Sequence, residues 1–504
     1  MKRYSLMIGL SLSLLTGFLF TLPAPSAAAK DAWVSVRSKN FRLIGNANEA
    51  DIRQVAVKLE QFREVFSRLF SQASLHASVP PTVIVFKNDA SYQPFKPLYQ
   101  GKPTDVAGYF LVDQDINYIT LTAERRITNP YATIFHEYVH ALTSNTLRGA
   151  PLWLKEGLAE YYSTFDVADG EKKIWLGKPR TDHLALLREK KLLPLQTLFA
   201  IKSDSQHYND SDERSVFYAE SWVLVHYLLL ANKEQYQAKF LRYLSTLTTG
   251  LPVSESFQQV FQTDEATIEH ELERYIKRTN YPEQSVVLDR RLEFDTTMQS
   301  APLSEAGAQA ILGDLLLHAQ RFDEAETWLQ QALTLDPELA DAHTSLGLLL
   351  TRQRRFDEAK KHLQRAIASD SRNYLSHYYY AVIFSREGVG ENQLVSNFAP
   401  ETAALMRTEL KRTIELAPNF LDAYHLLAFV NLATGEQIEE AITLLKRVLA
   451  MAPSREESAF LLARVYLHEV DFASARRLLE PIARNSANAQ LRAQAQSLLN
   501  EMTR

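Results

Sequence analysis

The chain has 504 residues, 46% of them hydrophobic, and a formal net charge of −5. This length exceeds what one hydrophobic core usually serves, so at least two globular domains are expected, and the small charge without a basic block argues against a nucleic-acid or anionic-membrane surface. The chain has no cysteine, which excludes disulfides, thiolate metal sites and cysteine nucleophiles, so any metal must be held by His, Asp or Glu.

The first residues have the layout of a bacterial secretory signal peptide. Lys2 and Arg3 precede a long apolar run, and a small-residue cleavage pattern follows at Ala27 to Ala29. We expect a signal peptide over residues 1–29 and therefore a periplasmic or extracellular protein. An uncleaved membrane anchor is the alternative, because the apolar run approaches the roughly 20 residues that span a bilayer.

Strand and helix patterns follow in the next hundred residues. Residues 33–45 alternate apolar and polar side chains, which predicts a half-buried strand, and residues 49–72 carry apolar side chains at helical spacing. Residues 81–89 form a short β-branched apolar run, and residues 106–123 predict two strands joined by a turn. An open sheet is therefore expected just before residue 131.

The segment 131–165 carries the pattern of greatest chemical interest. His136 and His140 are one helical turn apart and therefore lie on the same side of a predicted helix, with Glu137 beside them. In the H-E-x-x-H motif, two imidazoles bind zinc and the glutamate is the general base for the attacking water. The sequence thus predicts a Zn²⁺ site, and the alternative is a surface helix with two solvated histidines.

A zinc enzyme needs a third protein ligand beside an open position for water. Glu156 and Glu160 are the candidates, one turn apart in the next predicted helix. The order H-E-x-x-H, loop, W-L-x-E-G-x-A resembles the gluzincin metallopeptidases, in particular their aminopeptidase branch, and the resemblance implies Glu156 as the third ligand.

The spacing leaves this assignment open. Only 15 residues separate His140 from Glu156, fewer than is usual in that family, whereas 19 separate His140 from Glu160, as in thermolysin-like enzymes. Glu156 is preferred because the residues around it match the motif. Glu160 is then expected to accept a hydrogen bond from a ligand histidine.

A third segment adds a candidate catalytic tyrosine. Residues 217–230 resemble the aminopeptidase pattern Y-E-x-G-F-x-x-x-x-Y-L, whose leading tyrosine donates a hydrogen bond to the oxyanion, so the match implies a catalytic Tyr218. Ser221 stands where the pattern has glycine, and ordinary core packing is the alternative for this segment. The G-x-M-E-N signature that binds a free amino terminus is absent, so the resemblance implies an endopeptidase acting on peptides or proteins.

The resemblance as a whole is to the bacterial peptidase MA-like domain, and it implies an α+β gluzincin-like metallopeptidase fold over residues 30–285. Strands around Gly108 to Phe110 would then border the cleft, where gluzincins bind an extended peptide along an edge strand.

From about residue 301 the sequence repeats itself with a fixed period. Gly313 aligns with Gly347 and Ala325 with Ala359, each pair 34 residues apart. The period and the small residues resemble tetratricopeptide repeats, which form an all-α solenoid of stacked helix pairs. We expect these repeats over residues 301–504, after a linker at 286–300, with an insertion near 387–402 and a final capping helix.

Two functions are consistent with this sequence. The leading interpretation is a secreted zinc metallopeptidase whose repeats recruit a protein partner or the substrate. The alternative is a catalytically inactive, peptidase-like scaffold whose repeats mediate protein–protein interaction in the cell envelope. The first is favoured because the expected metal ligands, the base and the tyrosine are all present in the sequence.

Overall fold

The structure is a computed structural model that describes residues 31–69, 81–99, 101–104, 106–113, 115–124, 131–143, 147, 150–168, 172–202, 205, 211–231, 233–246, 253–287, 297–370, 372–387, 397–486 and 488–502. The expected signal peptide, residues 1–29, lies outside these ranges. Trp33–Arg504 forms one compact unit. Among the described helices, none has both the length and the apolar character needed to cross a membrane.

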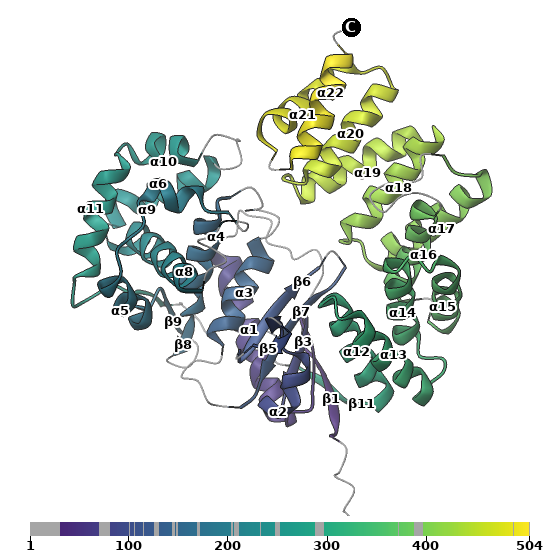
Figure 1. The fold of residues 1–504 in the computed structure, drawn as a ribbon, viewed down its shortest axis with the longest axis horizontal. Coiled ribbons are helices and arrows are strands. Elements are labelled where there is room, and N and C mark those ends of the chain that lie inside the picture. Colours follow the sequence, from purple (N-terminus) through teal and green to yellow (C-terminus); the bar gives the residue numbers. More distant parts are fainter. Residues whose placement is uncertain are drawn as a thin grey trace, which may run out of the picture. The chain divides into compact units, whose positions relative to one another are not determined.

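A mixed six-stranded sheet organises the N-terminal part, with the strand order β11-β1-β2-β3-β7-β6 (Figure 1). The strands are β1 (Trp33–Arg37), β2 (Arg42–Gly45), β3 (Pro81–Phe86), β6 (Gly108–Val112), β7 (Asn117–Thr122) and β11 (Gln299–Leu303). β3 pairs in parallel with β2 and β7, and the other neighbours are antiparallel. The two strands predicted within residues 106–123 are confirmed as β6 and β7, and β6 forms an edge of the sheet.

The region 33–45 differs from the prediction of a single strand. It contains β1 and β2, which form an antiparallel pair. The buried Glu60 stabilises the turn between the two strands. Its Oε1 accepts hydrogen bonds from Ser38 Oγ at 2.7 Å and from the backbone N–H of Asn40 at 2.8 Å. Glu60 lies on helix α1 (Glu49–Leu69), so this contact has no signature in the local pattern.

Helices cover one face of the sheet. Phe62 of α1 stacks on Phe135 of α3 (Ala132–Thr143) with ring centroids 4.7 Å apart, and both belong to a core cluster with Val83 and Ile119 of the sheet. The same cluster includes residues of α4 (Leu152–Ser163) and α8 (Ser211–His226). Further helices among the described residues of this part are α2 (Asp89–Tyr92), η1 (Gln93–Phe95), α5 (Thr181–Glu189), α6 (Leu195–Ala200), η2 (Tyr227–Ala231), α9 (Lys233–Thr246), α10 (Val253–Phe261) and α11 (Glu265–Ile276).

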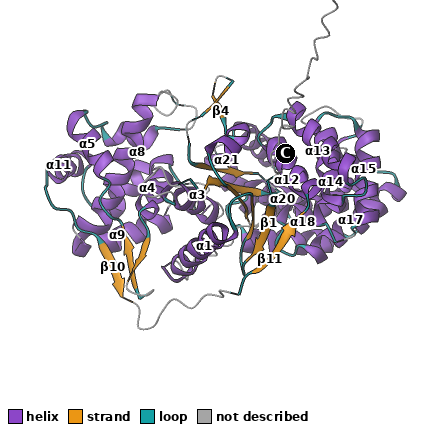
Figure 2. Ribbon diagram, turned by 90° about the horizontal axis from the view of Figure 1, so that it is seen from below, coloured by secondary structure: helices purple, strands orange, loops and turns teal. Residues whose placement is uncertain are grey.

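Two smaller sheets also lie among the described residues of the N-terminal part. β8 (Asp166–Ala168), β9 (Lys173–Leu176) and β10 (Gln284–Val287) form an antiparallel sheet, and β4 (Leu98–Tyr99) pairs with β5 (Lys102–Pro103) in a short hairpin (Figure 2). The mixture of strands and helices agrees with the expected α+β class.

The described residues of the C-terminal part form five helix pairs and a final helix. They are α12 (Glu305–His318), α13 (Phe322–Leu335), α14 (Ala340–Arg352), α15 (Phe356–Ser369), α16 (Tyr374–Arg386), α17 (Pro400–Leu416), α18 (Leu421–Thr434), α19 (Ile438–Met451), α20 (Glu456–His468), α21 (Phe472–Asn485) and α22 (Ala489–Glu501). The repeated glycines have a steric role, because a Cβ at Gly347 would lie 2.4 Å from Leu363 Cγ of the paired helix.

The expected insertion near 387–402 falls between α16 and α17. Its last residues already belong to α17, which begins at Pro400. Residues 388–396 lie outside the described ranges.

The expected linker at 286–300 is not a free connection at either end. Val286 and Val287 belong to β10, and Gln299 and Ser300 belong to β11, which pairs with β1. The sequence QSAPL of β11 has no apolar alternation, so its pairing depends on the open edge of β1 rather than on a local pattern.

The second face of the sheet is covered by the first repeats. Ile84 and Phe86 point to the opposite side from Val83, as successive strand residues do, and they share a core cluster with Leu315 of α12 and Leu349 of α14. The two expected domains therefore share a core, although their sequence patterns are distinct.

Candidate metal centre

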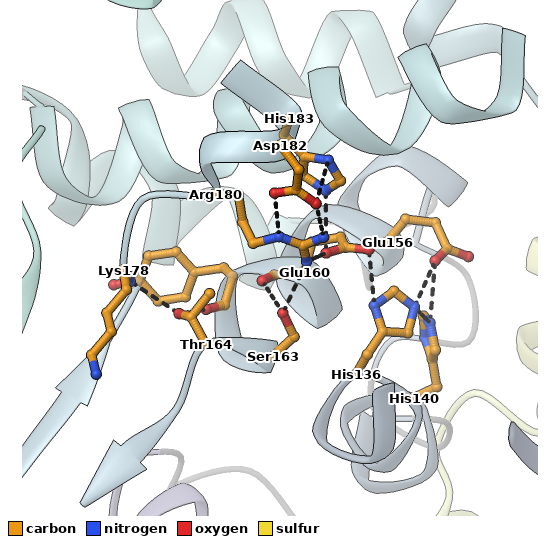
Figure 3. Close-up of polar contacts among 11 residues, drawn as sticks. His136, His140, Glu156, Glu160, Ser163, Thr164, Lys178, Arg180, Asp182 and His183 are labelled. Carbon is orange, nitrogen blue, oxygen red and sulfur yellow. Dashed lines mark hydrogen bonds and ion pairs between the residues drawn. The ribbon is translucent and has the colours of Figure 1, made fainter. Parts of the chain in front are cut away.

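The four candidate metal-site residues lie on two adjacent helices. α3 carries His136 and His140, α4 carries Glu156 and Glu160, and the two helices pack against each other (Figure 3). Both imidazoles point toward α4. The one-turn spacing in each helix places each pair on a common face, as the sequence predicted.

Three of these side chains converge on one point. His136 Nε2 and His140 Nε2 are 3.2 Å apart, and each lies 3.3 Å from Glu156 Oε2. In a tetrahedral zinc site with metal–ligand distances of about 2.0–2.1 Å, neighbouring ligand atoms are separated by about 3.3 Å. The three atoms therefore already have the mutual spacing of tetrahedral zinc ligands.

The environment of Glu156 fits the same interpretation. Its side chain is 6% exposed, and its Oε2 has no aligned hydrogen-bond donor among the described residues. The two imidazoles are its close neighbours, and a divalent cation would satisfy this buried oxygen together with the two imidazole nitrogens. Burial opposes ionisation of this carboxyl, but His136 and His140 lower its pKa to about 2.

Glu160 lies on the other side of His136. Its Oε1 is 3.3 Å from His136 Nδ1. This ring nitrogen is not part of the ligand triangle formed by His136 Nε2, His140 Nε2 and Glu156 Oε2. Burial would reduce the basicity of His136, but the carboxylates of Glu156 and Glu160 raise its pKa to about 10 in the metal-free protein. The two glutamates therefore occupy different positions. Glu156 contacts the Nε2 atoms of both histidines, whereas Glu160 contacts Nδ1 of His136.

Arg180 holds the far oxygen of Glu160. Its Nη1 donates to Glu160 Oε2 and, at 3.4 Å, to Ser163 Oγ. Its Nε and Nη2 donate to the two oxygens of Asp182 at 3.0 and 2.7 Å (Figure 3). His183 Nε2 also lies 3.3 Å from Glu160 Oε2. The result is a continuous chain of charged contacts from Asp182 to His136.

Sequence reasoning missed this chain. Arg180, Asp182 and His183 belong to a charged stretch at the start of α5, and their partner Glu160 lies 20 residues before Arg180. The stretch is anchored by the buried His226, whose Nε2 donates to the carbonyl of Gly177 at 2.9 Å. Charged residues at a helix start were the available signal, and such residues are common without a functional role.

A cavity of about 530 Å³ adjoins the site. His136, Glu137, Glu160, Arg180 and Tyr218 are among the residues that line it. Burial raises the pKa of the Glu137 carboxyl, as suits a general base. The ring of Tyr218 lies 6.1 Å from that of His136, centroid to centroid. The predicted base and the predicted tyrosine are therefore brought to one cavity beside the predicted ligands.

Gly157 allows α4 and α8 to pack closely, which brings α8 to the site. A Cβ at this position would lie 2.4 Å from the Ser221 carbonyl oxygen and 2.7 Å from Val225 Cγ2, so only glycine permits this approach of α4 and α8. Tyr218 lies on α8, one turn before Ser221. Edge strand β6 contacts α3, the helix that carries the two histidines.

Comparisons with known proteins identify the repeats. Residues 304–372 and 436–500 each match a family described as tetratricopeptide repeat. The C-terminal half is a tetratricopeptide-repeat array. This confirms the predicted solenoid, an architecture that serves protein–protein interaction. Residues 130–254, which include every residue of the candidate centre, match a family described as "Protein of unknown function (DUF1570)".

Solved structures are similar to the repeats at low identity. They include YrrB, a TPR protein with an unusual peptide-binding site (18% identity, covering 38% of this chain and 92% of that chain, TM-score 0.32). Others are pilF of Pseudomonas aeruginosa (20%, 39% and 86%, 0.32) and a thermophilic TPR protein of Thermus thermophilus (19%, 38% and 98%, 0.30). Curated proteins give no match. None of these families or structures is described as a peptidase.

Proposed function

We propose that this chain is an exported zinc-dependent metallopeptidase that hydrolyses peptide bonds in peptide or protein substrates. The observation that carries the proposal is the ligand triangle, in which His136 Nε2, His140 Nε2 and Glu156 Oε2 are separated by 3.2 to 3.3 Å. Three protein ligands with a fourth position left for water are typical of catalytic zinc. The resemblance to gluzincins supports the same assignment.

Glu137, Tyr218 and Glu160 each have a role in the proposed hydrolysis of a peptide bond. Zinc held by His136, His140 and Glu156 would supply Lewis-acid activation of the peptide carbonyl and of the attacking water. Glu137 takes a proton from the attacking water and delivers it to the leaving amine. Tyr218 donates a hydrogen bond to the oxyanion. Glu160 holds Nδ1 of His136, which leaves Nε2 free to bind the metal.

The substrate class follows from the neighbourhood of the site. β6 is an edge strand beside α3, so its outer side offers main-chain hydrogen bonds to an extended peptide. Such recognition depends little on side chains and does not require a free terminus. An endopeptidase therefore agrees better with this arrangement than an exopeptidase.

Metal analysis combined with peptide hydrolysis tests this function. The purified protein should contain about one zinc per chain, and His140→Ala should lose it, whereas His270→Ala, a change at an exposed histidine outside the site, should not. Glu137→Gln should keep the zinc and abolish cleavage of a quenched fluorescent peptide library. Full zinc in His140→Ala, or unchanged cleavage by Glu137→Gln, would refute the assignment.

A scaffold without catalytic activity is the second candidate. It is favoured by the family matches, which identify interaction repeats in one half and a family of unknown function in the other. Wild-type protein that binds zinc but leaves both a peptide library and unfolded casein intact would support the scaffold. Export, common to both candidates, is tested by the N-terminal sequence of the mature protein.

A further inference from the structure

A second cluster of polar side chains lies where the first repeats meet the sheet. Asp113 and Asp115 belong to the turn between β6 and β7, and His318 ends helix α12. The side chains of Asp115 and His318 are only 3% and 2% exposed. Charged groups buried to this extent must be satisfied by one another.

The contacts in this cluster are those of a junction rather than of a cation site. Asp115 Oδ2 accepts hydrogen bonds from His318 Nε2, at 3.1 Å, and from the hydroxyl of Tyr379. Asp113 Oδ2 accepts from Arg352 Nη2 at 2.9 Å. The carboxylates therefore already have donors, and the guanidinium of Arg352 would repel a metal ion.

His318 is the charged centre of the junction. Its Nδ1 lies 2.8 Å from the carbonyl oxygen of Asp314, while its Nε2 faces the Asp115 carboxylate. Both partners are acceptors, so both ring nitrogens carry protons and the imidazole is a cation. Asp314 in turn accepts from Tyr118 of β7 at 2.7 Å and from Ser345 of α14 at 2.5 Å.

Three successive repeats contribute one side chain each to this junction, in every case from the first helix of the pair. His318, Arg352 and Tyr379 lie on α12, α14 and α16, the first helix of each of the first three pairs. These helices contact one another in order. A single face of the repeat array therefore binds the turn between β6 and β7, as it would bind a segment of another protein.

Polar and apolar contacts have different roles here. The shared core cluster includes Ile84 and Phe86 of the sheet and Leu315 of α12. The apolar surface buried there supplies most of the free energy that holds the repeats against the sheet. Buried ion pairs add little net stability, but they strongly disfavour any arrangement that leaves a charge unpaired. The junction therefore fixes the register in which the repeats meet the turn.

We propose that the first helices of repeats one to three form a docking surface for the chain's own turn between β6 and β7, and that this contact positions edge strand β6 beside α3. The docking itself is independent of zinc. Its consequence for substrate binding rests on the proposed function, because β6 is the strand along which a peptide substrate is proposed to lie. The part of these helices that holds the turn is then unavailable to a partner protein.

Hydrogen exchange on the full-length protein tests the docking. Tyr379→Phe should accelerate exchange of the Gly108–Val112 amides about tenfold, the effect expected from losing roughly one hydrogen bond to a charged group. Asp115→Asn, which also removes the negative charge beside His318, should accelerate it by more. Amides of β1, four strands away in the sheet, should keep their protection. Tyr424→Phe is the matched control, because it removes another buried tyrosine hydroxyl of the repeats, one that donates to the Pro418 carbonyl. Unchanged exchange in β6 for both variants would overturn the docking role.

Kinetics with a quenched fluorescent peptide library test the consequence. If β6 binds substrate, the same variants should raise KM several-fold while zinc content and kcat stay near wild type. Faster exchange in β6 with an unchanged KM would leave the docking intact and refute the role in substrate binding. Wild-type protein without zinc or cleavage would instead refute the proposed function, and the exchange result would still decide the docking.

Discussion

The carboxylate of Glu160 lies 3.3 Å from Nδ1 of His136, the ring nitrogen that faces away from the ligand triangle. A carboxylate in this position orients the ring and sets which nitrogen is free for a metal. Its other oxygen is held by Arg180, which is itself bound in bidentate fashion by Asp182. The orientation of His136 therefore depends on residues from a separate segment of the chain.

We expect Arg180→Met to weaken zinc binding about 10- to 100-fold, the usual effect of removing such an outer contact. Arg180→Lys should restore only part of the affinity, because lysine cannot bridge Glu160 and Asp182 with a planar fork. Competition with a chromogenic chelator measures the affinity. Arg188→Met is the control, since Arg188 bonds only to backbone carbonyls and Tyr281 among the described residues. Equal zinc affinity of Arg180→Met and wild type would show that Arg180 does not position the site.

Substitution of the two glutamates separates their roles. Glu156→Ala removes one corner of the triangle and should abolish zinc retention during dialysis, whereas Glu160→Ala should retain zinc with reduced affinity. Metal content by mass spectrometry gives the answer directly. The reverse order of effects would assign Glu160 as the third ligand, as the longer spacing in the sequence allowed.

Tyr218→Phe should lower kcat about 100-fold or more with zinc content unchanged, because it removes a single donor to the oxyanion. Cleavage of a peptide library by matched amounts of zinc-loaded protein measures the loss. Tyr161→Phe provides the comparison, since the Tyr161 hydroxyl donates to Gln284 at 3.0 Å. An equal loss in both variants would point to a general structural effect instead of a catalytic one.

The candidate metal ligands on α3 could be predicted from the sequence because their spacing is local. His136 and His140 are one turn apart, and this alone places them on a common face. The residues around Glu156 favoured it over Glu160, but the spacing left the choice open, because it depends on how α4 is rotated against α3. That rotation is restricted by the contact of Gly157 with Ser221, 64 residues later in the chain.

In the fold, too, features that depend on neighbouring residues were predicted, and features that depend on distant residues were missed. The repeat period and the long amphipathic helices were predicted because each depends on residues a few positions apart. The β1–β2 turn was missed because its stabilising partner, Glu60, lies on α1, and β11 was missed because it completes an edge far away in sequence. Arg180 was missed for the same reason, because it acts on the site only by holding the carboxylate of Glu160, a residue of another helix.

Gly157→Ala should destabilise the protein by about 1–3 kcal/mol, the usual cost of forcing a methyl group into a packed interior. The new Cβ would meet the Ser221 carbonyl oxygen at 2.4 Å, and backbone cannot move aside as a side chain can. Thermal unfolding measures the effect. Gly307→Ala is the matched helical control, because its Cβ would contact only side-chain atoms of Leu303 and Ser304 at 3.1 Å or more. Equal melting temperatures for the two variants would contradict the steric role of Gly157.

Glu220 should make stability depend on pH. Burial raises its pKa to about 8, although the Leu193 amide donates to it at 2.9 Å. Because the ordinary value is 4.5, the native state holds one more proton than the unfolded state between these limits, so native stability falls as pH rises. The slope from this group approaches about 1.4 kcal/mol per pH unit. Glu220→Gln, which has no proton to lose, should therefore match wild type near pH 5 and exceed it in melting temperature near pH 8. The exposed Glu401→Gln change should leave the pH profile unaltered, and parallel profiles for wild type and Glu220→Gln would show that Glu220 is ionised in the folded protein throughout this range.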